Sequence, residues 1–85
     1  MAKTLEKFSA ALSWVISEKK ILQKELAEEV GVSQTSITDY KQGKREGDED
    51  TRKKIATALG YDYQSFLSLG EWIVGGNNGK EFNQF

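Results

Sequence analysis

The sequence has 85 residues, the length of one small domain, so it leaves no room for a second globular unit. It is 38% hydrophobic and 29% charged, which is ordinary for globular proteins and argues against disorder along the whole chain. The sequence contains no Cys and no His, which excludes disulfides and removes the commonest metal ligands, nucleophile and general base. We therefore expect no catalytic residues, no metal and no cofactor, and a protein that is not an enzyme.

Charge and hydropathy restrict the partners of the chain. No apolar run approaches the roughly 20 residues of a transmembrane helix, and the N-terminus lacks the apolar stretch of a signal peptide. The sequence therefore predicts a cytoplasmic protein that does not enter the membrane. The net charge of −1 does not by itself indicate nucleic acid, because nucleic-acid-binding domains usually carry a basic patch or a high pI.

The first half of the chain predicts three helices. Apolar residues at helical spacing mark a first helix over residues 5–18, with Thr4 as its N-cap. A short second helix runs from about residue 23 to residue 30 and stops at Gly31. Ser33 is a suitable N-cap for a third helix, which reaches about Gln42 and ends at Gly43.

The second half predicts two more helices and a tail. Acidic residues 48–50 open a fourth helix, where they meet the positive end of its dipole, and Gly60 ends it. Asp62 can cap a fifth helix, which either stops at Gly70 or continues to residue 74. Residues 1–74 are then one all-α domain, and residues 75–85 form a flexible tail or an interdomain linker.

The spacing within residues 23–40 predicts a helix-turn-helix unit at the second and third helices. A small residue, Ala27, stands where the second helix of the unit would cross closely, and Gly31 suits the left-handed conformation of the turn. The remaining constrained positions hold apolar side chains that would face the core: Leu26, Val30, Val32, Ile37 and Tyr40.

The side of the third helix opposite its buried residues is entirely polar and mostly short-chained. It carries Gln34, Thr35, Thr38, Asp39 and Gln42. Such groups can enter a major groove and hydrogen-bond to base edges, unlike the Lys and Glu that an ordinary solvated helix face displays. Three positive charges follow within five residues, where flanking phosphates would lie. They belong to Lys41, Lys44 and Arg45.

The stretch from Gln23 to Lys44 resembles the DNA-binding domain of the lambdoid phage repressor and Cro family, which includes the xenobiotic-response-element type of bacterial regulators. The likeness extends over residues 5–69 and implies a five-helix lambda-repressor-like fold. It also implies that the third helix reads an operator in double-stranded DNA. By position, the resemblance predicts base contacts from Gln34, Thr35, Thr38 and Asp39. It predicts phosphate contacts from Gln23, Gln42 and Lys44, to which we add Arg45 on its charge alone.

The resemblance implies a transcriptional repressor of phage or prophage type that binds a near-palindromic operator as a homodimer and excludes polymerase. The apolar residues of the last helix offer a dimer contact through Leu69, Trp72 and Ile73. Alternatively, they fold back onto the first helix. In many relatives, such a tail leads to a LexA-like dimerisation domain, so the chain is either a complete regulator or the N-terminal part of one.

A second function fits the same fold. The domain could be a helical protein-interaction module that does not bind DNA, which its acidic composition favours and the polar face of the third helix opposes.

Overall fold

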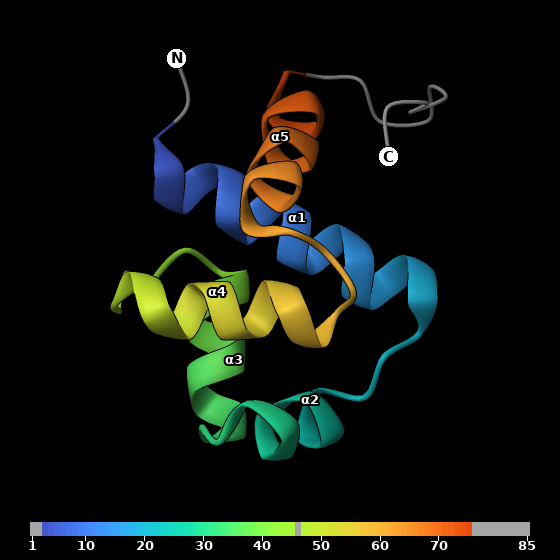
Figure 1. Cartoon of the computed structure of the whole chain (residues 1–85), viewed down its shortest axis with the longest axis vertical. Coiled ribbons are helices and arrows are strands. Elements are labelled where there is room, and N and C mark those ends of the chain that lie inside the picture. Colours follow the sequence, from blue (N-terminus) through green and yellow to red (C-terminus); the bar gives the residue numbers. More distant parts are fainter. Residues whose placement is uncertain (1–2, 46, 76–85) are drawn as a thin grey trace.

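In a computed structural model, which describes residues 3–45 and 47–75, these ranges form five helices joined by short loops (Figure 1). The helices are α1 (Thr4–Lys19), α2 (Gln23–Val30), α3 (Gln34–Lys41), α4 (Glu49–Ala58) and α5 (Tyr63–Val74). The described ranges contain no strand, so the predicted all-α, five-helix fold is confirmed. None of these helices has the length and apolar character needed to span a bilayer. The predicted tail or linker lies, apart from Gly75, outside the described residues.

Side-chain caps begin the last two helices, at the predicted cap Asp62 and at Asp48, the first of the acidic residues predicted to open the fourth helix. The Asp48 carboxylate accepts a hydrogen bond from the Thr51 N–H at 2.8 Å, and the Asp62 carboxylate accepts one from the Gln64 N–H at 3.1 Å. Hydrogen bonds from Thr51 hold the pKa of the Asp48 carboxyl below its ordinary value. Each cap satisfies an N–H that has no partner within its helix.

The predicted cap of the first helix is wrong. Thr4 is the first helical residue of α1, and Lys3 occupies the cap position without a side-chain hydrogen bond. A cap needs extended backbone at its own position, and the chain adopts that conformation at Lys3. The periodic apolar pattern does not distinguish between these two neighbouring residues.

Phe8 lies at the centre of the core and joins three helices. Its ring meets Tyr40 of α3 edge-on at 5.5 Å between centroids, and Phe66 of α5 at 5.4 Å. Phe8 and Phe66 are completely buried, and Tyr40 is nearly so. Such edge-to-face aromatic pairs contribute about 0.5–1.5 kcal/mol beyond the burial of their area.

The last helix packs closely across α1 (Figure 1) because it carries a glycine at the contact. A Cβ atom built on Gly70 would overlap the backbone carbonyl of Lys7, so no larger residue fits this approach. The helix continues through Gly70 to Val74. Glycine costs about 1 kcal/mol inside a helix, and the close packing of the two helices offsets that cost.

The predicted dimer contact through Leu69 is wrong, because this side chain is 1% exposed and belongs to the core of its own chain. Leu69 instead folds into the core that α1 and α5 share, in agreement with the alternative prediction. Trp72 and Ile73 pack against the same core but remain half-buried. Only Val74 of this helix end is a large exposed apolar residue, at 45%.

The Gly70→Ala substitution tests this packing. It should lower the free energy of unfolding by about 1–3 kcal/mol, because α1 and α5 must separate to admit the methyl group. Urea denaturation followed by circular dichroism measures the effect. Ser68→Ala, at an exposed position of the same helix, is the matched control and should change stability by less than about 0.5 kcal/mol. A Gly70→Ala variant as stable as the natural chain would contradict the described approach of the helices.

Candidate nucleic-acid interface

The third helix is held in place from beneath and at its end. Ile37 is completely buried and Tyr40 is 2% exposed, so both anchor α3 in the core as the sequence predicts. Burial raises the pKa of the Tyr40 hydroxyl, and the nearby Asp48 carboxylate adds to the effect. The Ser13 hydroxyl of α1 donates a hydrogen bond to the Lys41 carbonyl at 3.1 Å. These contacts fix the direction of α3 relative to the rest of the domain.

The turn between α2 and α3 has the predicted geometry. Gly31 adopts a φ of 88°, which suits glycine, and its N–H donates to the Ala27 carbonyl at 2.8 Å. The Val32 N–H donates to the same carbonyl at 3.0 Å. Leu26 and Ala27 are buried, whereas Val30 and Val32 pack against the core and stay half-buried. The spacing of these residues therefore does form a helix-turn-helix.

A serine begins the helix that follows the turn. The Ser33 hydroxyl accepts a hydrogen bond from the Ser36 N–H at 3.1 Å, which confirms the predicted cap. The helix then presents Gln34 and Thr35 at its first turn, and both are exposed. The cap thus determines where the polar face begins.

The predicted base-contact residues share one accessible surface of α3. Gln34 and Thr35 are exposed, and Thr38 and Asp39 are partly exposed. Gln42, which caps the end of the helix, is also exposed. The polar face is therefore open along its length, opposite the buried Ile37 and Tyr40.

Asp39 and Arg45 form an ion pair that sequence reasoning missed. The Arg45 guanidinium lies 3.7 Å from the Asp39 carboxylate, with both side chains partly exposed. The Lys44 N–H donates to the Asp39 carbonyl at 2.9 Å and brings the following residue back toward the helix. The pair depends on how the chain turns after α3, which residue spacing does not reveal.

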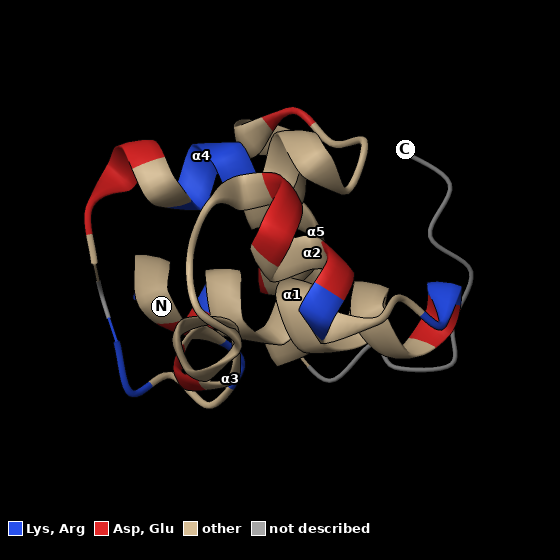
Figure 2. Ribbon diagram, turned by 90° about the horizontal axis from the view of Figure 1, so that it is seen from below, with Lys and Arg blue, Asp and Glu red and all other residues tan. Residues whose placement is uncertain are grey.

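The other predicted phosphate contacts lie in different settings. Lys44 is exposed on the segment after α3, whose Lys and Arg ribbon lies beside that helix in Figure 2. Acidic residues also lie on α2 and at the start of α4 (Figure 2). Gln23 begins α2, and its side-chain oxygen is buried without a hydrogen-bond partner. The side-chain N–H of Gln23 could donate a hydrogen bond to a phosphate. The side-chain oxygen could not bind a phosphate, because both are acceptors.

Arg52 supports the segment after α3, a role that the sequence gives no sign of. Its Nε donates to the Tyr63 hydroxyl at 3.0 Å, and its Nη1 donates to the Gly47 carbonyl at 3.4 Å. The side chain therefore joins the loop before α4 to the first residue of α5. The sequence does not reveal this role, because Gly47 and Tyr63 lie on opposite sides of Arg52 along the chain and meet its side chain only in the fold.

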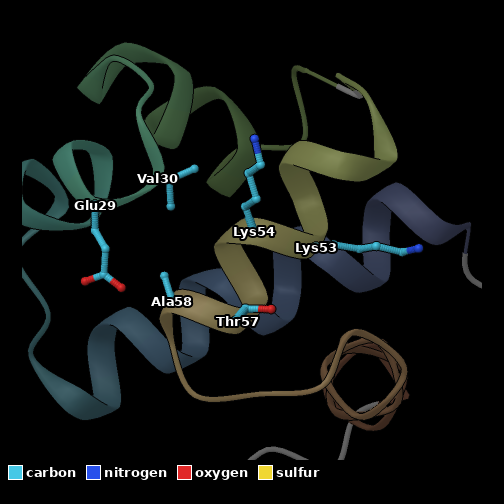
Figure 3. Close-up of a pocket in the computed structure, with 6 residues that line it drawn as sticks. All are labelled: Glu29, Val30, Lys53, Lys54, Thr57 and Ala58. Carbon is cyan, nitrogen blue, oxygen red and sulfur yellow. The ribbon is translucent and has the colours of Figure 1, made fainter.

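An open hollow between α2 and α4 has no set of converging polar groups. Val30 and Ala58 line it together with Glu29, Lys53, Lys54 and Thr57 (Figure 3). The charged ends of the two lysines point in different directions (Figure 3). Among the described residues, no cluster of His, Cys, Asp or Glu has the composition of a metal site.

The sequence profile of the Cro/C1-type helix-turn-helix proteins, a family that includes the xenobiotic-response-element regulators, matches residues 16–66. The matched region contains α2, α3 and α4 and therefore the whole helix-turn-helix unit. The chain belongs to this Cro/C1-type family. Family membership identifies it as a DNA-binding transcriptional regulator whose partner is double-stranded DNA. No curated protein sequence matches the chain.

Solved structures give the same fold as this Cro/C1-type chain. One is a crystal structure of the clp gene regulator ClgR from Corynebacterium glutamicum, with a TM-score of 0.79 and 22% sequence identity, covering 89% of this chain and 81% of that one. A second crystal structure of ClgR has a TM-score of 0.74 and 22% identity, covering 95% of this chain and 100% of the other. At this identity the likeness concerns the fold alone.

Proposed function

We propose that the chain is a sequence-specific repressor of phage type that reads an operator with α3 in the major groove. The observation that carries the proposal is the open polar face of α3, supported from beneath by the buried Ile37 and Tyr40. Base-reading side chains on a helix that the core holds rigidly can meet base edges in a fixed register.

The residues of this face match the groups on base edges. Gln34 can bond to N6 and N7 of adenine through both ends of its amide. The methyl groups of Thr35 and Thr38 can contact a thymine methyl, and their hydroxyls can bond to an edge or a phosphate. Asp39 can accept from N4 of cytosine. The face can therefore distinguish base pairs and not only the charge of DNA.

Phosphate contacts would fix the register of the helix on the duplex. Gln42 caps the end of α3 and Lys44 lies on the segment that follows. Gln23 lies at the N-terminus of α2, where backbone N–H groups and the helix dipole favour an anion. With a net charge of −1, the protein has little general attraction for DNA. Specific affinity would then rest on a few local contacts together with base reading.

Repression would follow from occupancy of an operator that overlaps a promoter. A homodimer on a near-palindromic site places two copies of α3 about one helical turn apart in the major groove. Because Leu69 is buried, the predicted dimer contact is reduced to Trp72 and Ile73, which lie next to the exposed Val74.

Selection of binding sites from a random duplex pool tests the proposal directly. The 85-residue chain should enrich a two-fold symmetric motif, because a symmetric dimer reads the same bases in each half-site. Enrichment of an asymmetric motif would contradict the dimer. If no motif were enriched, the protein-interaction module would be the better description of the chain.

Substitution of Gln34 tests base reading by α3. Gln34→Ala should weaken binding to the selected operator by about 1–3 kcal/mol and leave binding to random duplex nearly unchanged, because the amide contacts a base edge. Titration by fluorescence anisotropy measures both affinities. Gln64→Ala, an exposed glutamine of α5, is the matched control and should alter neither. Unchanged operator affinity in Gln34→Ala would refute the assignment.

Substitution of Lys44 tests the phosphate contacts. Lys44→Ala should weaken binding to all duplexes alike and lower the slope of log affinity against log salt by about one, because one fewer counterion is released. Lys53→Ala removes the same charge from the exposed side of α4 and should change the slope less. A loss confined to the selected operator would instead place Lys44 on a base.

A further inference from the structure

The Arg45 guanidinium is turned toward the polar face of α3, where it pairs with Asp39. The chain reverses after Gly43, and the hydrogen bond from the Lys44 N–H to the Asp39 carbonyl at 2.9 Å closes this reversal. The guanidinium of the next residue then lies 3.7 Å from the Asp39 carboxylate. Asp39 itself stands on the open side of α3, so the pair lies beside the groups that would face the bases.

The ion pair matters more for its location on the polar face of α3 than for the stability of the fold. The side chains of Arg45 and Asp39 are 48% and 29% exposed, and pairs in such settings contribute little to folding. An unpaired carboxylate on a DNA-facing surface would repel phosphates. Arg45 neutralises the negative charge of Asp39. In turn, Asp39 holds the long side chain of Arg45 close to one orientation.

We propose that Arg45, positioned by Asp39, reads a guanine in the major groove at the C-terminal end of α3. The inference rests on the proposed function and gives Arg45 a base contact in place of a phosphate contact. The guanidinium has five N–H donors in a fixed plane, so the contact with Asp39 leaves others available. Guanine presents two adjacent acceptors, O6 and N7, which match a pair of these donors.

The pair as a whole is complementary to one G·C base pair. Arg45 donates to guanine while the Asp39 carboxylate can accept from N4 of the paired cytosine. Over an A·T pair, the amino group of adenine would meet the donors of Arg45, so one of the two hydrogen bonds would be lost. A phosphate contact would show no such preference, because phosphate carries no sequence information.

The experiment measures the preference for that base pair in the natural chain and in three variants. Each G·C pair of the operator obtained by selection is replaced in turn by A·T, and affinities are measured by anisotropy titration. The natural chain should lose about 5- to 150-fold in affinity at one G·C pair in each half-site. In Arg45→Ala, that same replacement should change affinity by less than about 3-fold, since the reader of the pair is gone.

Asp39→Ala tests whether the two side chains act as a pair, because it removes both the partner of Arg45 and the acceptor for cytosine N4. It keeps the charge of Arg45 but removes its partner, so the preference at that pair should fall below that of the natural chain while the salt slope does not decrease. Lys44→Ala is the matched control, because it removes the neighbouring positive charge and should keep the full G·C preference. Thermal melting checks that each variant is folded.

Two outcomes would overturn the inference and leave the proposed function intact. In the first, Arg45→Ala weakens all duplexes by the same factor, as Lys44→Ala does. In the second, Asp39→Ala keeps the full preference for the G·C pair. Failure of the natural chain to enrich any duplex would overturn the proposed function together with this inference.

Discussion

The placement of α3 depends on the contacts that Phe8 makes in the core. Its ring meets Tyr40 of α3 and Phe66 of α5 edge-on, so one side chain of α1 sets the spacing of the helices on either side. Since all three rings are nearly or wholly buried, α3 cannot rotate about its axis without opening the core. A change at Phe8 would therefore alter the direction of the polar face without touching any residue on it.

A rigid helix matters more here than in a basic DNA-binding domain. With a net charge of −1, the protein has little general attraction for phosphates. Under the proposed function, specific binding comes from well-placed hydrogen bonds, which weaken steeply when their angles are poor. The hydrogen bond from Ser13 to Lys41 and those of Arg52 hold the end of α3 and the segment that follows it. The structure thus supports both the helix and its basic flank.

Much of the fold and of the candidate site can be predicted from sequence, because the signals are local. Ser33 and Asp62 cap their helices as predicted, and Asp48 begins the fourth helix where the acidic residues predict its start, since a cap involves residues only two or three positions apart. The predictions for Thr4 and Leu69 fail for different reasons. The start of α1 depends on backbone conformation at one residue, and the burial of Leu69 depends on where α5 meets α1. The same limit applies to Arg45, whose ion pair forms only after the chain turns back.

The sequence by itself determined the five helices, the helix-turn-helix register and the polar composition of the outer face of α3. These features follow from periodicity, capping and one glycine turn, which act over a few residues. Tertiary structure alone decided the close approach of α5 to α1 at Gly70 and the meeting of Arg45 with Asp39. These features depend on contacts across turns and between distant elements, where small changes in direction decide which side chains meet.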